Sequence, residues 1–168
     1  ELVPRAVRIG MLAPDVPSFR LQLQETQKAA AALQVELDVV EVRGGDYSGA
    51  FATISSRRPD ALVVGANTFF MMNRKPIIAL AAKHRLPAVY EWPEQVRDGG
   101  LIAYGASLDG LYARIGAYAD QLFRGKKPAD LPVEQPTNFE LVVNLKTARA
   151  LGITIKESFL MRADDVIE

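Results

Sequence analysis

The side chains in this sequence that could take part in chemistry are few, and most are acidic or aromatic. Asp15 and Glu91 carry carboxylates that could receive an ammonium group. Ser18 stands at the entrance of a predicted helix, where free backbone N–H groups and the helix dipole favour a carboxylate or phosphate. Apolar walls could come from Phe69, Phe70, Tyr90, Trp92 and Tyr104. Together these groups would suit a small zwitterion with an apolar side chain.

The sequence gives no support for catalysis. It has no cysteine, which excludes disulfides, thiolate zinc sites and cysteine nucleophiles, and its one histidine, His84, stands at the end of a predicted helix before Arg85. The segment RIGMLAPDVPS lacks the GxGxxG spacing, and GxxxxGK[ST] does not occur. Asp15, Asp46 and Asp60 lie on separate elements. Because no nucleophile, base and oxyanion donor converge, we predict a protein that is not an enzyme and holds neither metal nor cofactor.

Several of these residues also have an ordinary structural interpretation. Ser18 and Asp46 are residue types that cap helices. Asn67 and Thr68 are also typical of a turn. The run 69–72 (FFMM) is typical of a buried core or a subunit contact as well as of a ligand wall. These alternatives remain open at the level of the sequence.

Length and composition limit the class of protein. The chain has 168 residues, 49% of them hydrophobic and 24% charged, which is enough apolar material for one domain, or one domain with an appendage. Lys plus Arg and Asp plus Glu both number 20, so no basic excess favours nucleic acid. No apolar run approaches the ~20 residues of a membrane span, and the opening ELVPR does not have the pattern of a signal peptide.

The alternation of apolar runs and helical periods predicts an α/β fold. The expected strands and helices alternate four times in the first part of the chain, which is the signature of βαβ units and a parallel sheet. The strands are expected at 7–12, 35–42, 61–65, 87–90 and 101–104, and the helices at 19–33, 46–58 and 73–84. In such a sheet, ligands collect beyond the carboxyl ends of the strands. Trp92, just past one of these ends, is costly to expose without a partner.

The pattern changes after Tyr104. Residues 108–124 form a long amphipathic helix whose apolar side chains need a large apolar partner. Three prolines between Pro128 and Pro136 mark a connection between bodies. A strand at 139–144, a short helix at 146–151 and a final extended tail complete the chain.

The order of these segments resembles a known family. RRPDALVVGAN (57–67), RLPAVY (85–90), GGLIAYG (99–105) and KPADLPVEQPTNFELVVNLKTARALG (127–152) are similar to the extracytoplasmic solute-binding proteins of ABC transporters, and to the tryptophan/tyrosine-type group in particular. The resemblance covers nearly the whole chain. It implies a non-catalytic component of an import system that holds a small solute, such as an amino acid or aromatic compound, and delivers it to membrane permease subunits outside the cytoplasm.

The resemblance also implies a domain organisation. Such proteins have two α/β lobes of the type I periplasmic-binding-protein fold that close by hinge motion, and they are about twice as long as this chain. We therefore expect a C-terminal fragment in which 1–106 form the second, Rossmann-like lobe. Residues 107–138 would be a crossover and helix of the missing first lobe, and 139–168 a return to the second lobe. The uncovered face of 108–124 would then make the fragment self-associate as a dimer.

The ligand contacts implied by the resemblance fall in the loops that follow the strands. They are Asp15, Ser18, Asn67, Thr68, Tyr90, Glu91 and Tyr104. Two loops depart from the family pattern. Aromatic-amino-acid binders often have an acidic residue followed by Asn-Ser in the first loop, where this chain reads Asp15-Val16-Pro17-Ser18, and some have Asp-Asn-Thr where it reads Ala66-Asn67-Thr68. The identity of the solute therefore stays open.

Two alternatives share the predicted architecture. Effector domains of LacI-type repressors have it but need a DNA-binding headpiece upstream. Flavodoxin-like or sugar-phosphate enzymes have related folds, and the missing phosphate loops disfavour them. A first lobe encoded upstream would favour the solute receptor, and a helix-turn-helix there would favour the repressor.

Overall fold

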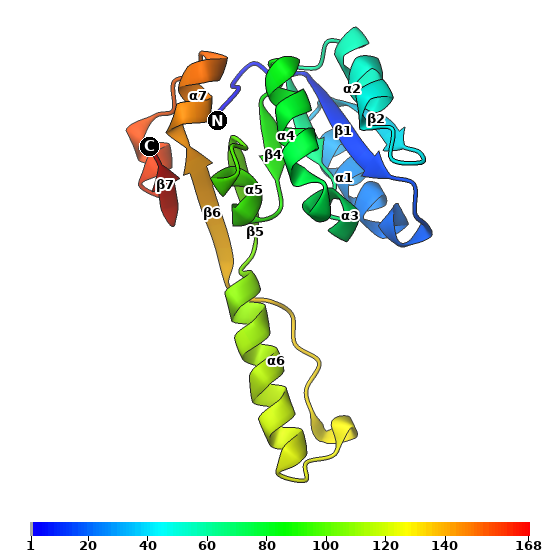
Figure 1. The fold of residues 1–168 in the computed structure, drawn as a ribbon, viewed down its shortest axis with the longest axis vertical. Helices are drawn as coiled ribbons and strands as arrows, with labels where there is room; N and C mark the ends of the chain where they lie inside the picture. Colours follow the sequence, from blue (N-terminus) through cyan, green and yellow to red (C-terminus); the bar gives the residue numbers. More distant parts are fainter. Residues whose placement is uncertain (1) are drawn as a thin grey trace.

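The computed structural model describes residues 2–168 and contains one seven-stranded sheet with the order β2-β1-β3-β4-β5-β6-β7. All neighbouring strands are parallel except β5 and β6, which are antiparallel. Figure 1 shows the sheet as the centre of a head from which a long arm projects. The strands are β1 (Arg8–Pro14), β2 (Glu36–Val42), β3 (Ala61–Val64), β4 (Ala88–Tyr90), β5 (Ile102–Ala106), β6 (Phe139–Asn144) and β7 (Asp165–Ile167).

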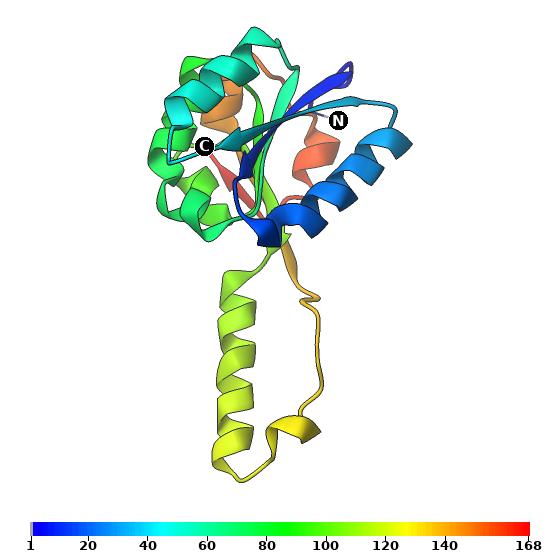
Figure 2. The same cartoon turned by 90° about the vertical axis from the view of Figure 1, so that its right-hand side faces the viewer.

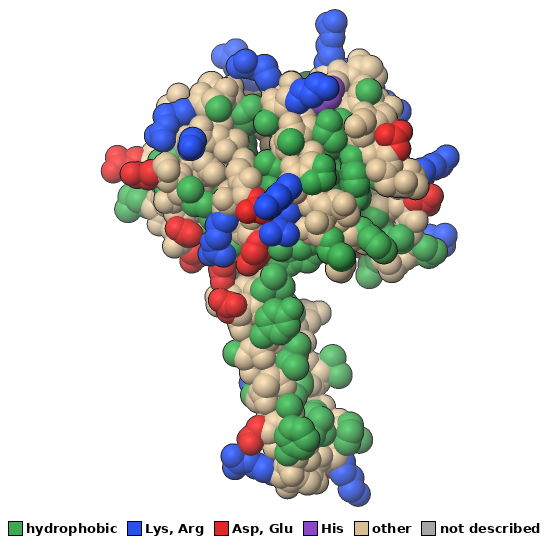
Figure 3. Space-filling model, in the orientation of Figure 1, with side chains coloured by type: hydrophobic (Ala, Val, Ile, Leu, Met, Phe, Trp, Pro, Cys, Tyr) green, Lys and Arg blue, Asp and Glu red, His purple; other side chains and the backbone are tan. Residues whose placement is uncertain are grey.

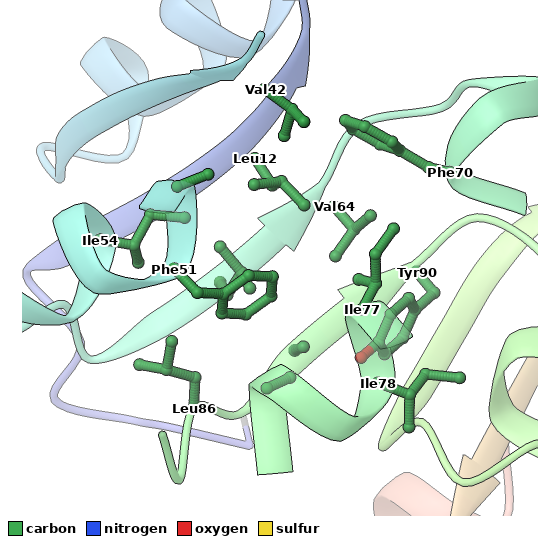
Figure 4. Packing of buried hydrophobic residues seen from close by; sticks show 14 of the residues in the cluster. Leu12, Val42, Phe51, Ile54, Val64, Phe70, Ile77, Ile78, Leu86 and Tyr90 are labelled. Atoms are coloured by element: carbon green, nitrogen blue, oxygen red, sulfur yellow. The ribbon is translucent and has the colours of Figure 1, made fainter. Parts of the chain in front are cut away.

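Helices cover both faces of the sheet in the head. Phe51 and Ile54 of α2, Ile77 of α4 and Val96 of α5 belong to the largest buried cluster, on one face. Figure 4 shows part of this cluster, with Phe51 near the centre of the packed side chains. The helices are α1 (Arg20–Ala32), α2 (Tyr47–Ser56), α3 (Thr68–Met72), α4 (Arg74–Lys83), α5 (Pro93–Arg97), α6 (Leu108–Phe123), α7 (Leu145–Leu151) and α8 (Glu157–Leu160), with 3₁₀ turns η1 (Pro17–Phe19) and η2 (Pro128–Asp130).

The other face of the sheet has two smaller clusters. Phe19 packs with Met11 of β1 under α1. Ile102 of β5 and Val143 of β6 pack with α7 and with Phe159 of α8. Apolar residues on both faces explain why the strands appear in the sequence as nearly continuous apolar runs. The predicted α/β fold with a mostly parallel sheet is confirmed.

The antiparallel pair β5–β6 is the one exception to the parallel order of the described strands. The chain leaves the head at the end of β5, runs out along the arm and returns directly into β6, so that Ala106 lies opposite Phe139 and Ile102 opposite Val143. A strand that re-enters beside the strand by which the chain left must run in the opposite direction. The two strands therefore form the neck that joins head and arm (Figure 1).

The predicted helix caps have different outcomes. The Asp46 carboxylate accepts a hydrogen bond from the Gly49 N–H at 2.9 Å and caps α2 as expected. The expected cap at Ser18 is wrong, because Pro17 begins a 3₁₀ turn and α1 starts only after Phe19, with no side-chain cap. Proline has the φ angle of a helical turn already fixed, so the turn begins at Pro17 and leaves Ser18 within it.

The arm consists of α6, η2 and an extended return at 131–138. None of the residues of α6 is buried. Tyr118 donates a hydrogen bond from its hydroxyl to the Pro132 carbonyl at 2.8 Å, and Arg114 forms an ion pair with Glu134, so the return segment is held beside the helix. Figure 2 shows the two running side by side away from the head. Residues 107–138 therefore project from the head as α6 and its return segment.

The apolar face of α6 is open to solvent within residues 2–168. Tyr112, Ile115 and Phe123 are 68%, 61% and 89% exposed. Figure 3 shows hydrophobic side chains extending along the arm and up to its junction with the head. None of the helices that the structure describes has the length and apolar character of a membrane span.

Candidate functional site

The loops that follow β1, β2, β3, β4 and β5 lie at the end of the sheet from which the arm leaves. We call this end the rim and define it as residues 14–18, 43–47, 65–70, 91–92 and 104–106. The strands that lead into it are parallel, so their carboxyl ends meet there. Figure 1 shows that the arm continues from the same end, through β5 into α6. The rim is the place where open parallel sheets bind ligands.

An open hollow of 390 Å³ lies at the rim between the loop after β1, the turn after β2 and helix α3. Asp15 lines it and Tyr47, Phe69 and Asn73 complete it. The Asp15 carboxylate is exposed, and Arg43 approaches it to 4.0 Å. Partial burial raises the pKa of the Tyr47 phenol, whose ring meets the Phe70 ring edge-on at 6.1 Å. The hollow therefore combines the carboxylate of Asp15 with aromatic walls.

Tyr47 and Asn73 line the hollow but were not predicted from the sequence. Tyr47 follows the turn Gly44-Gly45, which the positive φ angles of both glycines allow to fold back tightly at the rim. An aromatic residue two positions after such a turn, at the start of a helix, was a signal that could have identified it. Asn73 had no such signal, because it reaches the hollow through the short helix α3, which the sequence pattern does not predict.

The loop after β3 has a well-defined geometry. The Asn67 side-chain oxygen accepts a hydrogen bond from the Phe69 N–H at 2.8 Å and caps α3. Thr68 is the first residue of α3 and is exposed. Both residues lie at the rim, where the side chain of Asn67 also caps α3. Ser18 is also exposed at the rim, on the turn η1.

Tyr90 does not reach the rim surface. Its side chain is 2% exposed and belongs to the main core cluster, and it packs so close to Gly100 that a Cβ there would come within 2.7 Å of its ring. Burial raises the pKa of its phenol well above the ordinary value. Tyr90 is therefore part of the core beneath the rim. Its side chain has almost no exposed surface with which to contact a ligand in this structure.

Glu91 is the most unusual polar group at the rim. It follows Tyr90 directly and is half-buried, and its Oε2 is a buried oxygen without a hydrogen-bond partner in the part of the chain described. Burial raises the pKa of this carboxyl to about 6. A buried carboxylate oxygen without a donor is costly, because it loses its hydrogen bonds with water and gains none in return. Glu91 is therefore prepared to accept a donor that the chain itself does not supply.

Residues near Glu91 have their own partners. Trp92 is half-buried and is the N-cap residue of α5, and its backbone N–H donates to the Gln95 side chain at 3.1 Å. Glu94 also has a buried, unpartnered Oε2, but its Oε1 lies 3.6 Å from Arg97. Within residues 2–168, no three or more His, Asp or Glu side chains converge in a way that could hold a metal ion.

Tyr104 lies at the neck, on β5, and is 60% exposed. Its ring stacks on that of Phe139 in β6, with centroids 5.8 Å apart and planes inclined by 22°. The ladder pairs Tyr104 with Leu141 and Ala106 with Phe139, so the two aromatic residues are diagonal neighbours on one face of the strand pair. The structure thus brings Tyr104 to the rim as predicted and adds Phe139, which the sequence analysis did not select.

Solved structures with the same fold define the class of protein. An ABC domain in complex with L-Trp from Streptococcus pneumoniae has a TM-score of 0.90 and 26% identity, over 99% of this chain and 57% of that one. A conserved domain protein from Vibrio cholerae has a TM-score of 0.88 and 23% identity, over 99% of this chain and 56% of that one. The head and neck are thus similar to part of a periplasmic-binding-protein-like fold.

The family follows from the sequence. The model of the family described as "ABC transporter substrate binding protein" matches residues 1–167, so the chain belongs to that family. A curated relative, the tyrosine-binding protein of Clostridioides difficile, is 23% identical over 154 residues, which are 90% of this chain and 44% of that protein. The chain spans about half the length of these relatives. The family match confirms the resemblance and favours a solute receptor over a repressor domain or a flavodoxin-like enzyme.

Proposed function

We propose that this chain is the second lobe of a solute-binding protein that serves an ABC importer. The observation that carries the proposal is the rim, where the unpartnered Oε2 of Glu91 lies near exposed aromatic and polar groups at the carboxyl ends of parallel strands. A half-buried carboxylate is suited to an ammonium group, which would supply the hydrogen-bond donors that it lacks. Family membership of residues 1–167 supports the same role.

The solute that fits this rim best is a small amino acid with an aromatic side chain. Asp15 and Glu91 offer carboxylates, and Tyr47, Phe69 and Tyr104 offer aromatic surface. Two similar proteins agree with this choice, one solved in complex with L-Trp and one described as tyrosine-binding. We propose Asp15, Ser18, Asn67, Thr68, Glu91 and Tyr104 as contacts, and leave out Tyr90 because it is buried.

The other half of the cleft would come from a first lobe that this chain does not contain. Support comes from the arm, whose apolar side chains are exposed along α6, and from the relatives, of which this chain covers 44% to 57%. We propose that the first lobe covers α6, so that 1–106 and 139–168 form the second lobe and 107–138 belong to the first. β5 and β6 would then be the hinge.

The proposed role implies a location and partners. Solute-binding proteins of this family act outside the cytoplasm and deliver their solute to permease subunits in the membrane, and we propose both for the full-length protein. Binding and release require no covalent step. For the isolated chain we expect self-association through 108–124, because the apolar side chains of α6 are exposed.

A thermal-shift screen of the full-length protein tests this proposal. We expect L-tyrosine, L-tryptophan or L-phenylalanine to raise its melting temperature, because a ligand that binds only the folded state stabilises it. Sugars and nucleoside phosphates serve as controls and are expected to have no effect. A shift with a sugar phosphate and none with any amino acid would contradict the proposed solute class.

A further inference from the structure

The hollow at the rim lies two strands away from Glu91. It is formed by the loop after β1, the turn after β2 and helix α3, whereas Glu91 follows β4. The sheet order places only β3 between β1 and β4. Since neighbouring strands are about 4.8 Å apart, the end of β1 lies about 10 Å across the sheet from the end of β4. An aromatic amino acid whose ammonium group meets Glu91 is long enough for its ring to reach the hollow.

The walls of the hollow are aromatic and firmly packed. Tyr47 is half-buried, and its ring meets the Phe70 ring edge-on with centroids 6.1 Å apart. Phe70 and Val42, both labelled in Figure 4, belong to the main core cluster and also line the hollow. Phe69 lines it from α3 and is 63% exposed. A flat ring placed in this hollow would remove apolar surface of Tyr47 and Phe69 from water.

Asn73 adds a polar group to this aromatic hollow. Its side-chain Nδ2 donates a hydrogen bond to the Phe69 carbonyl at 2.9 Å, and because a carbonyl can only accept, this contact fixes which end of the amide is the donor. Within residues 2–168, the Asn73 Oδ1 accepts no hydrogen bond. Asp15 also lines the hollow, but it is exposed and Arg43 approaches it to 4.0 Å. A half-buried side chain with an unused acceptor therefore remains at Asn73.

We infer that the hollow receives the ring of the solute and that Asn73 selects rings that carry a hydrogen-bond donor. The phenol O–H of tyrosine and the indole N–H of tryptophan are such donors, and the ring of phenylalanine has none. This inference rests on the proposed function and adds Tyr47 and Asn73 to the proposed contacts. A site that forms a hydrogen bond with a hydroxyl group of its ligand disfavours the analogue that lacks the hydroxyl, as phenylalanine does relative to tyrosine.

Calorimetric titration of the full-length protein with L-tyrosine, L-tryptophan and L-phenylalanine tests this selection. The variant Asn73→Leu replaces the amide by an apolar side chain of similar size, and the Phe69 carbonyl keeps the backbone N–H of residue 73 as a donor at 2.9 Å. We expect the wild type to bind tyrosine and tryptophan more tightly than phenylalanine. The variant is expected to weaken binding of the first two about three- to tenfold, the effect of one lost hydrogen bond, and to leave phenylalanine binding nearly unchanged.

Two further variants separate the roles of the ring and the amide. Tyr47→Leu removes an aromatic wall and is expected to weaken binding of all three amino acids while keeping the ratio of tyrosine to phenylalanine affinity. Gln24→Leu is the matched control, because it removes an exposed amide from α1, outside the hollow, and is expected to change neither affinity nor ratio.

The inference is overturned by equal losses for all three amino acids with Asn73→Leu, by unchanged tyrosine binding in that variant, or by unchanged binding with Tyr47→Leu. A wild type that binds phenylalanine as tightly as tyrosine would also overturn it. In each of these cases the proposed function stands. If the wild-type protein binds none of the three amino acids, the proposed function fails and this inference with it.

Discussion

Glu91 occupies the space in which Gly105 has no side chain, so the loop after β4 lies directly against strand β5 of the neck. A Cβ at position 105 would collide with the Glu91 carbonyl, and backbone atoms cannot move aside as a flexible side chain can. The closest approach of the rim to the neck therefore depends on a glycine. A displacement of β5 would therefore also displace the Glu91 loop.

Gly105→Ala is expected to destabilise the protein. The added methyl group must push the Glu91 loop away from β5, and overpacking of this kind costs about 1–3 kcal/mol. Urea denaturation of the 168-residue chain followed by circular dichroism would measure the change in unfolding free energy. Gly116→Ala on α6 is the matched control, because nothing lies within 4 Å of a Cβ there. We expect this control to be neutral or stabilising by up to about 1 kcal/mol, and equal destabilisation by both would contradict the account.

Glu91→Gln is expected to stabilise the folded chain at neutral pH and not at acidic pH. The pKa of Glu91 is raised to about 6 in the folded state by burial, so ionisation there costs stability above that pH. The cost is complete above pH 6 and decreases as the pH falls toward the unfolded value of 4.5, below which the carboxyl is protonated in both states. Solvent screening of a half-buried group limits the gain at pH 7.5 to the order of 1 kcal/mol.

Unfolding free energies of wild type and Glu91→Gln at pH 7.5, 6 and 4.5 check this prediction. Glu41→Gln is a suitable control, since Glu41 is exposed on β2 and paired with Arg43 at 3.1 Å. If Glu91→Gln stabilises the chain equally at all three pH values, burial does not raise the pKa of the Glu91 carboxyl, and the account is contradicted.

Asn67→Ala is expected to lower the unfolding free energy by about 1 kcal/mol, because it removes the side-chain cap of α3 at the rim. Thr68→Ala, one residue along and exposed, is expected to change stability by less than about 0.5 kcal/mol. Thermal or urea unfolding of the two variants side by side gives the comparison. If Thr68→Ala lowers the unfolding free energy as much as Asn67→Ala does, the Asn67 side-chain cap does not stabilise this loop.

The exposed apolar face of α6 predicts that the 168-residue chain self-associates. Ile115→Glu, or Phe123→Glu, is expected to convert a self-associating 168-residue chain into a monomer, because each places a charge on the uncovered face of α6. Size-exclusion chromatography with light scattering over a range of concentrations measures this. A similar substitution on the head, Leu33→Glu, removes a side chain that is 73% exposed and serves as the control. A wild-type chain that stays monomeric at high concentration would contradict the expectation.

The sequence predicted most of the fold because the determining signals are local. Apolar runs such as that around Met11 identify the strands, and the residues that follow them identify the rim. Local signals failed where one residue changes the geometry, as Pro17 does for Ser18. They also failed where alternation along a strand decides orientation, since the side chain of Tyr90 joins the buried cluster that contains Ala103.

The rest of the site depends on contacts between distant segments. Phe139 stacks on Tyr104 only through the β5–β6 register, and Asn73 reaches the hollow only through α3. The unpartnered oxygen of Glu91 depends on its burial in the folded chain and cannot be deduced from its neighbours in the sequence. Sequence periodicity contains no information on such pairs before the topology is known.

The central claim is that this chain supplies one of the two lobes that enclose the solute. Calorimetric titration with L-tyrosine and L-tryptophan tests it on the full-length protein and, in parallel, on the 168-residue chain. We predict saturable binding by the full-length protein and weak or no binding by the chain alone, since half of the contacts and the enclosure of the ligand are missing. Micromolar binding by the chain alone, or no binding by the full-length protein to either amino acid, would contradict the account.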